Sequence, residues 1–311
     1  MKIRFLLPML LCAASAFAAT ERGTMIRAAQ IYLSPDANSP KLAVINRGHE
    51  VAVLERTQNW VHVLAVTREQ SDFDPGQQVT GWMLNKGYVL PTTPNGDRIL
   101  FGEAVDSENE ASRRGGRKGA AGDARRLYAR TEEYFPTSPL AGEALYRAAD
   151  IQWQIDREDV FTRPSARQRD PNARPTIDDQ AMKHIMHKYA HTKWADMAAF
   201  HLIDNKLCGD WQGLSKCPEK EAELYEKYAS EYPQSPDTPE ALYQAARRQA
   251  ALIDLYPNEQ KQAKVPEAKS KAQGLCQRII SQFGQSDWAA RAQTLLFEVD
   301  QGVPVYGNAL Q

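Results

Sequence analysis

The sequence predicts a multidomain protein, in which a small all-β barrel is followed by an all-α helical solenoid. Three observations support this prediction. Short runs rich in valine, isoleucine and leucine, separated by turn residues, fill residues 22–90. Proline, asparagine and glycine then interrupt the chain between residues 91 and 96. Beyond residue 123, one pattern of aromatic, serine and alanine residues recurs four times, which is typical of stacked helical units.

Residues 1–18 have the features of a cleaved signal peptide. Lys2 and Arg4 precede an apolar run over residues 5–16, and Ala16-Phe17-Ala18 is a small-x-small cleavage pattern. The run is too short to span a bilayer, which takes about 20 residues. We therefore expect an exported, periplasmic protein whose mature chain begins at Ala19.

The composition argues against two classes of function. The chain carries 38 basic and 39 acidic residues, for a net charge of −1, and loss of Lys2 and Arg4 leaves 36 against 39. Proteins that bind nucleic acid through their bulk charge are usually strongly basic, so we expect no nucleic-acid partner. A mean hydropathy of −0.55 and the lack of a later long apolar run predict no membrane span.

Within residues 22–90, four runs predict strands: 25–28, 41–45, 49–54 and 60–66. The run 49–54 partly alternates between apolar and polar residues, as a strand with one buried face does. Roughly 65 residues of short strands suffice for a small barrel that closes on itself.

Several motifs in this segment resemble a bacterial SH3-like domain. They are Ser34-Pro35, Arg47-Gly48, the run Val51–Leu54, the run Asn59–Val63 and Gly81-Trp82. The resemblance covers residues 22–90 and implies a barrel of a family that often binds cell-wall peptides. Tyr32, Trp60 and Trp82 are the candidate ligand-binding residues, since amphipathic rings anchor extended peptides well. The alternative is that Trp82, which follows Gly81, lies in the core or closes the barrel, and the same alternative is open for Trp60.

Residues 91–122 predict a linker with room for a short helix between residues 99 and 114. The segment 115–119 is rich in glycine and basic. It does not form a phosphate-binding loop, because Lys118 is followed by Gly119 where serine or threonine is required.

Residues 123–300 predict about four helix-turn-helix units, followed by a C-terminal tail, residues 301–311. The units align on a turn residue, an aromatic residue three positions before it and an alanine six positions after it. The turn residues are Ser138, Thr192, Ser235 and Ser286; the aromatic residues are Phe135, Tyr189, Tyr232 and Phe283; the alanines are Ala144, Ala198, Ala241 and Ala292. No single helix pair can bury its apolar face alone, so the units are expected to stack, with the alanines at the seams.

In two units the turn residue is followed by proline, in Ser138-Pro139 and Ser235-Pro236. There we expect serine to cap the second helix and proline to occupy its first position. The turn residues are 54, 43 and 51 positions apart, whereas a standard repeat has about 34 residues. Insertions are therefore expected at residues 156–176 and 206–218.

The runs Phe135–Pro139, Tyr232–Pro236 and Glu240–Ala246 resemble tetratricopeptide repeats. More narrowly, they resemble the variant found in periplasmic envelope-assembly proteins, which include the outer-membrane β-barrel assembly lipoprotein and the Tol–Pal-associated repeat protein. The resemblance implies a helical domain that holds protein partners.

Three cysteines remain in the mature chain. Cys208 and Cys217 flank a short insertion, so in an oxidising compartment we expect a disulfide between them. Closing a loop of about 10 residues contributes roughly 2.5–3 kcal/mol in the chain-entropy model. Cys276 lies at a helical position and should stay free and buried.

A histidine cluster leaves one alternative open. His184, His187, His191 and His201 are close in sequence, and on a helix His184 and His187, three residues apart, can face one metal ion. Their register instead matches solvent-facing positions of the other repeats, so we expect no metal and no other cofactor. No catalytic motif is complete, and we expect no enzymatic activity.

These features predict a non-enzymatic periplasmic scaffold or adaptor. Its helical repeats would bind protein partners, and its barrel would bind a cell-wall peptide, as part of peptidoglycan, or a protein segment. One alternative is an outer-membrane assembly or cell-division coordination factor. A metal-binding or hydrolase accessory protein is the other.

Overall fold

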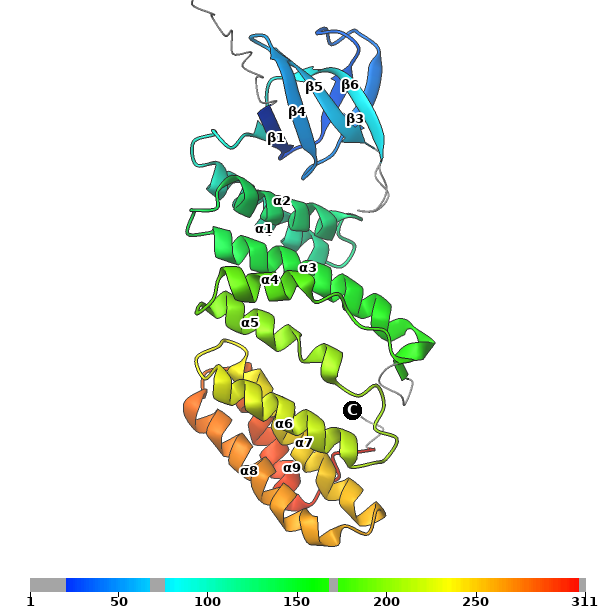
Figure 1. Cartoon of the computed structure of the whole chain (residues 1–311), viewed down its shortest axis with the longest axis vertical. Coiled ribbons are helices and arrows are strands. Elements are labelled where there is room, and N and C mark those ends of the chain that lie inside the picture. The colour runs from blue at the N-terminus through cyan, green and yellow to red at the C-terminus, as the bar shows by residue number, and fades with distance from the viewer. Residues whose placement is uncertain (1–20, 68–75, 168–172, 308–311) are drawn as a thin grey trace, which may run out of the picture. The chain divides into compact units, whose positions relative to one another are not determined.

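The computed structural model describes residues 21–67, 76–167 and 173–307, and Figure 1 shows their helices and strands. The predicted signal peptide and the last four residues of the C-terminal tail lie outside the described residues. The chain divides into two compact units, one ending at Leu100 and the other beginning at Phe101. Among the described helices, none is long and apolar enough to cross a bilayer.

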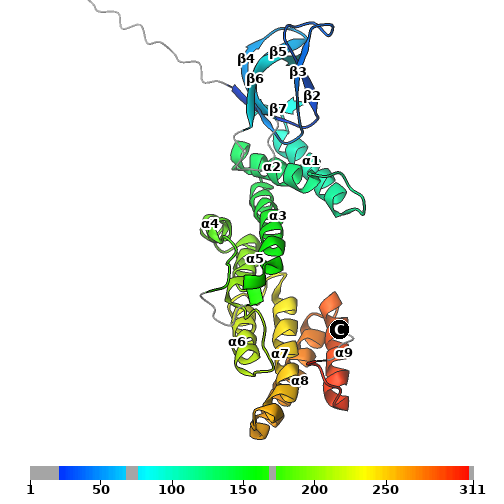
Figure 2. The ribbon, with the colours of Figure 1, turned by 90° about the vertical axis from the view of Figure 1, so that its right-hand side faces the viewer.

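The N-terminal unit is one curled antiparallel sheet, which Figure 2 shows from the side. Its strands are β1 (Glu21–Met25), β2 (Ala29–Tyr32), β3 (Lys41–Ile45), β4 (Glu50–Arg56), β5 (Trp60–Thr67), β6 (Gln77–Leu84) and β7 (Tyr88–Val89). They are hydrogen-bonded in the order β3-β2-β6-β5-β4-β1-β7. The order brings β2 against β6, far along the chain, and thereby curls the sheet around a core.

Alternation along the strands fills this core. In β5 every second residue from Val61 is buried, and β4 buries Val51 and Val53 in the same way. The core residues are Met25, Ile31, Ile45, Val51, Val53, Val61, Val63, Ala65 and Met83. The strands predicted at 41–45, 49–54 and 60–66 are confirmed within two residues at their ends.

The strand predicted at 25–28 is wrong. Met25 ends β1 and Ala29 begins β2, because the chain turns a corner between them. The amide of Ile26 at that corner donates to the carbonyl of Gly87, 2.9 Å away. Residues 25–28 therefore span a bend between two strands. The alternation of apolar and polar residues over only four positions cannot detect such a bend.

The second unit is helical and contains four helix pairs among the described residues. The helices are α1 (Gly96–Ser112), α2 (Ala120–Tyr134), α3 (Ala141–Thr162), α4 (Gln180–Lys188), α5 (Lys193–His201), α6 (Lys216–Glu231), α7 (Thr238–Asn258), α8 (Val265–Gln282) and α9 (Asp287–Gln301). Short 3-10 turns are η1 (Pro164–Arg167), η3 (Asp204–Lys206) and η4 (Gln262–Lys264). The pairs are α2–α3, α4–α5, α6–α7 and α8–α9, and they stack in this order (Figure 1).

Helix α1 belongs largely to the helical unit. The ring of Phe101 packs edge-on against Tyr128 of α2, with centroids 5.2 Å apart. Tyr128 is fully buried and donates a hydrogen bond of 2.6 Å to Glu108. The short helix expected between residues 99 and 114 corresponds to α1, and its aromatic and acidic side chains pack against α2.

All four pairs have the same turn. The aromatic residue is the C-cap of the first helix, and its amide bonds to the carbonyl four residues earlier, in Phe135, Tyr189, Tyr232 and Phe283 alike. The amide of the turn residue then bonds to that aromatic residue's carbonyl, at 3.0, 3.2, 3.1 and 2.9 Å in the four turns. The repeat register read from the sequence is confirmed.

The second helices start in two different ways. In the pairs without a turn proline, α5 and α9 begin directly after Thr192 and Ser286. Where proline follows, α3 and α7 begin three residues after the serine, and the predicted serine caps are wrong. The Ser138 hydroxyl instead accepts the amide of Leu140 in a turn that precedes the helix.

The seam alanines are all buried. Ala144, Ala198, Ala241 and Ala292 each have 0% exposure. Close packing at one seam also involves Gly142 of α3, because a Cβ atom there would lie 2.8 Å from the Trp194 ring. The small side chains therefore let neighbouring helices approach, as predicted.

The predicted disulfide joins Cys208 to Cys217, whose Cα atoms are 6.0 Å apart. Cys276 is free and buried. The closed loop is fixed to α6 by the buried carboxylate of Glu221, which accepts hydrogen bonds from the Cys208 amide at 2.8 Å and the Trp211 indole at 3.2 Å.

Candidate functional site

The barrel gathers its aromatic residues on one outer face. Tyr32 of β2 lies opposite Trp82 of β6, and Trp82 lies opposite His62 of β5. Trp60 stands two residues before His62 and therefore points to the same side of β5. We call Tyr32, Trp60, His62 and Trp82 the aromatic face; all four are partly exposed.

The rings contact one another in pairs. His62 and Trp82 stack, with centroids 4.9 Å apart and planes 20° from parallel. Tyr32 and Trp60 meet edge to face at 5.5 Å. Both geometries are favourable for aromatic pairs and hold the rings in fixed orientations. The face is therefore preorganised to contact a ligand.

Gly81 explains why Tyr32 and Trp82 come together. A Cβ atom at position 81 would lie 2.6 Å from the Tyr32 carbonyl oxygen and 2.7 Å from the Ile31 side chain. Only glycine lets β2 pass this close to β6. Gly81 and Met83 point into the core, so Trp82 between them points outward. The alternative that Trp82 or Trp60 belongs to the core is wrong.

A pocket of about 320 Å³ adjoins this face. Tyr32 forms part of its wall together with Leu84, whose side chain is 41% exposed. Arg27 and Lys86 contribute positive charge to the lining. The pocket and His62 were not predicted from the sequence, although alternation along Trp60-Val61-His62 carried the signal for the histidine.

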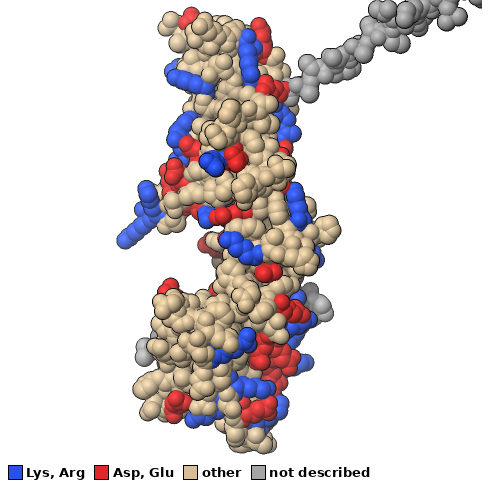
Figure 3. Space-filling view, turned by 90° about the vertical axis from the view of Figure 1, so that its left-hand side faces the viewer, with Lys and Arg blue, Asp and Glu red and all other residues tan. Residues whose placement is uncertain are grey.

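The helical unit contains a larger cavity, of about 870 Å³, which we call the helical groove. Its walls come mainly from α3, α5 and α7, the second helices of the first three pairs. On the side drawn in Figure 3, the surface of the helical unit is hollowed, while basic and acidic side chains are interspersed over the rest of that side. The charges that line the groove are less evenly distributed, because they comprise five carboxylates and two arginines.

Both arginines of the groove already have partners. Arg157 lies 3.0 Å from Asp204, and Arg248 lies 3.1 Å from the buried carboxylate of Glu221. Arg157 and Arg291 act on Glu240 only at longer range, where they lower its pKa. Among the described residues, Asp237 and Glu240 form no ion pair with lysine or arginine.

Asp237 stands out within the groove. It is the N-cap residue of α7, yet its side chain makes no capping hydrogen bond and lines the groove instead. Burial raises its pKa to about 6; His201 lowers the pKa, whereas Glu240 and Asp150 raise it. Burial likewise raises the pKa of Glu240. The groove thus holds carboxylates whose charge is incompletely compensated within the chain.

His201 connects two walls of the groove. Its Nε2 atom lies 3.1 Å from the Tyr146 hydroxyl and 3.1 Å from the Asp150 carboxylate, both on α3. Its ring also packs 5.6 Å from Trp153. This histidine, whose neighbours are far away in sequence, was not singled out as a site residue.

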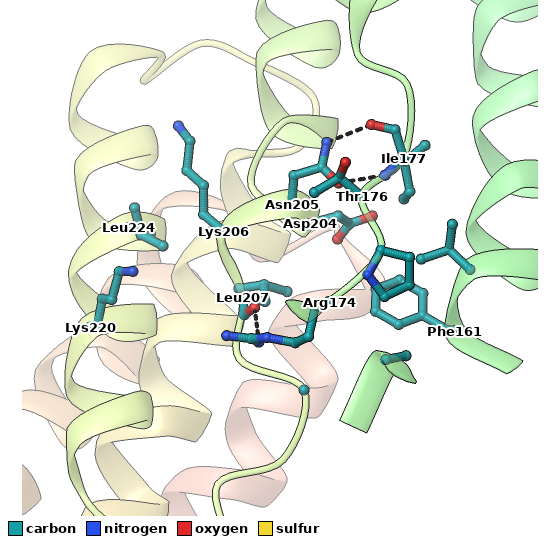
Figure 4. A pocket seen from close by; sticks show the side chains of 14 residues that line it. Phe161, Arg174, Thr176, Ile177, Asp204, Asn205, Lys206, Leu207, Lys220 and Leu224 are labelled. Atoms are coloured by element: carbon teal, nitrogen blue, oxygen red, sulfur yellow. Dashed lines mark hydrogen bonds between the residues drawn. The ribbon is translucent and has the colours of Figure 1, made fainter. Parts of the chain in front are cut away.

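A smaller pocket of about 300 Å³ shares Phe161, Asp204 and Leu207 with the groove. Figure 4 shows residues of both predicted insertions in its lining, such as Arg174 and Leu207, together with Lys220 and Leu224 of α6. Asn205 exchanges two hydrogen bonds of 2.9 Å with the backbone of Ile177, and Arg174 donates one of 2.8 Å to the Leu207 carbonyl.

The histidine cluster does not gather around a common point. His184, His187 and His191 are exposed. Within the parts of the chain that the structure describes, no three histidine, cysteine or acidic residues are arranged to hold a metal ion.

Comparison with known families gives one match. Residues 27–89 match the bacterial SH3 domain. The matched segment contains all strands from β2 to β7 and every residue of the aromatic face. No curated protein shows significant similarity to the chain.

Proposed function

We propose that this chain is a non-enzymatic adaptor of the bacterial cell envelope, with one ligand on each of its two units. Bacterial SH3 domains bind proteins or peptidoglycan, and residues 27–89 match that family. In this proposal the barrel binds a cell-wall peptide, and the helical unit, as tetratricopeptide-like repeats, binds a protein partner. The disulfide and the predicted signal peptide support a location in the oxidising periplasm.

The observation that carries the proposal is the aromatic face beside the pocket of Tyr32 and Leu84. Fixed, partly exposed rings offer a large contact area at a low entropic cost. Arg27 and Lys86 in the adjoining pocket suit a peptide that bears carboxylate groups. A wall peptide threaded across β5 and β6 would meet both features.

Purified peptidoglycan sacculi provide the test. The mature chain should sediment with them, and Trp60→Ala and Trp82→Ala should weaken binding, since loss of an aromatic anchor typically costs ~1–4 kcal/mol. Leu54→Ala is the matched control, because Leu54 is a 50% exposed apolar residue of β4 outside the aromatic face. Helix content should stay unchanged in all three variants.

Equal sedimentation of the three variants would contradict the assignment of the wall ligand to this face. Failure of the unaltered chain to sediment would favour a protein segment as the barrel's ligand. Such a result would point to the outer-membrane assembly or division-coordination alternative, in which the barrel binds protein.

A further inference from the structure

We propose that the helical groove binds a lysine- or arginine-containing segment of a partner protein, whose cationic side chain lies between Asp237, Glu240 and Phe200. The inference rests on the proposed role of the helical unit in holding a protein partner, and it specifies the chemistry of that partner. Four independent features of the groove support it.

The first feature is uncompensated negative charge. Asp150, Glu158, Asp204, Asp237 and Glu240 line the groove, against Arg157 and Arg248. Arg157 pairs with Asp204, Arg248 pairs with Glu221, and His201 lies 3.1 Å from Asp150, whereas Asp237 and Glu240 form no ion pair with lysine or arginine in the described chain. A cation from outside would supply the missing charge at a half-buried site, where screening by solvent is weak.

A second feature is the aromatic lining. The rings of Tyr146, Trp153, Phe161, Phe200 and Tyr225 face the cavity. Two of them already carry guanidinium groups: Arg157 lies 5.3 Å from the Phe161 centroid and Arg248 lies 4.9 Å from that of Tyr225. In the described chain, no lysine or arginine covers Tyr146, Trp153 or Phe200. Tyr146 and Trp153 are buried, with 7% and 2% exposure, whereas Phe200 is partly exposed, so Phe200 is the ring left for a partner's cation to contact.

The third feature is the orientation of Asp237, whose side chain lines the groove instead of capping its helix. An aspartate at an N-cap position usually accepts a backbone hydrogen bond from the first turn of its helix. Asp237 makes no such bond and faces the groove. Burial raises the pKa values of both Asp237 and Glu240, and neighbouring carboxylates add to the rise.

Size is the fourth feature. A cavity of about 870 Å³ can take an extended segment of several residues rather than a lone ion, since drug-sized ligands occupy roughly 300–1,000 Å³. The basic side chains Arg174, Lys206 and Lys220 at the adjoining pocket (Figure 4) would repel a second cation there. The segment is thus expected to carry its positive charge at the α7 end of the groove.

The test uses the full mature chain and two fluorescein-labelled probes at low ionic strength. One is a short peptide of serine, glycine and lysine, and the other has glutamate at each lysine position. We expect fluorescence anisotropy to show binding of the lysine peptide only. The variant Asp237→Asn with Glu240→Gln should weaken that binding tenfold or more, about 1.4 kcal/mol. Both substitutions keep side-chain shape, and asparagine remains a good N-cap residue.

The matched control is Glu223→Gln with Glu231→Gln. It makes the same change in net charge on exposed positions of α6 outside the groove. We expect its affinity to change less than twofold. Equal binding of the two double variants, or equal binding of the two peptides, would overturn the proposal.

A measurement on the unaltered chain keeps the proposal testable if the groove variant fails to fold. Lowering the pH from 7.5 to 5 should weaken lysine-peptide binding, because Asp237, whose pKa is about 6, is then largely protonated. Binding that does not weaken over this range would count against the groove.

The outcome is separable from that of the proposed barrel function. Trp82→Ala leaves the groove intact and should bind the lysine peptide normally. If the chain binds the peptide through the groove but does not bind sacculi, the result contradicts only the ligand assigned to the barrel. Sacculus binding without groove-dependent peptide binding contradicts the inference about the groove only.

Discussion

The aromatic face of the barrel and the helical groove both present rings to a ligand, but the chain builds them differently. The face comes from strands that neighbour one another in a single sheet, where His62, Trp82 and Tyr32 lie in adjacent register. The groove draws Asp150 and Asp237, which are distant in sequence, from helices of different pairs. The face therefore depends on one local close approach, and the groove depends on the stacking of whole repeats.

Their charges also differ. Arg27 and Lys86 make the pocket beside the aromatic face positive, whereas carboxylates dominate the groove. The two units are thus suited to ligands of opposite charge. A difference of this kind lets one chain hold two different partners without competition between them.

The largest expected effect tests whether the groove depends on the seams. Ala198 has 0% exposure in a core cluster that includes Trp153 and Met182. Ala198→Phe overpacks that seam and should destabilise the helical unit by about 3 kcal/mol. Thermal unfolding followed by far-ultraviolet circular dichroism measures the loss. Sacculus binding by the barrel should survive at temperatures where the helices have melted.

Ala181→Phe is the control, because Ala181 is exposed on α4 of the same helix pair. Its effect should stay within about 0.5 kcal/mol. If both variants melt alike, the seam at Ala198 is not the tight contact that its burial indicates.

The same contrast explains what the sequence could predict. The fourfold register of Ser138, Thr192, Ser235 and Ser286 identified all four turns, because each turn is made by residues close in sequence. Tyr32, Trp60 and Trp82 were recognised as candidates by residue type. Their meeting on one face was not predictable, since the pairing of β2 with β6 joins segments about 50 residues apart.

The groove was predicted only as a concave partner-binding surface without named residues. Asp237 directly precedes a helix, where an aspartate usually accepts a capping hydrogen bond. Its residue type and position therefore gave no sign that it lines the groove. His201 attracted interest only as a neighbour of His184 and His187, whereas its actual contacts are Tyr146 and Asp150 on another helix. Such sites arise from the angles between helices, and periodicity within one helix carries no information about those angles.

A second prediction contrasts two glycines, one in each unit. Gly81→Ala forces its Cβ atom against the Tyr32 backbone and should cost about 2 kcal/mol of barrel stability. Gly102→Ala in α1 meets no atom within 4 Å and should stabilise the helical unit by roughly 0.5–1 kcal/mol. Urea unfolding followed by the Trp60 and Trp82 indole resonances and by helical circular dichroism separates the two effects. Unchanged barrel stability in Gly81→Ala would mean that the barrel does not rely on the close approach of β2 and β6.

The smallest effect concerns the cost of keeping Asp237 charged. Its pKa is about 6 in the folded chain, against 3.8 for an unperturbed aspartate, so the folded state holds its proton more tightly than the unfolded state does. The resulting stabilisation is complete below pH 3.8 and is lost as the pH rises through about 6. Asp237→Asn, which is neutral at every pH, should therefore match the unaltered chain near pH 4 and exceed it at pH 7.5. After allowance for partial exposure, we expect a gain of about 1 kcal/mol, or ~2–4 °C in melting temperature for a unit of this size.

His201, Asp150 and Glu240 remain in place, so the comparison isolates one charge. Melting curves at the two pH values measure the gain, and an equal shift at both would mean that packing rather than charge is responsible. A variant that is more stable at neutral pH yet binds the lysine peptide more weakly would show that the Asp237 carboxylate contributes to partner binding and does not stabilise the fold.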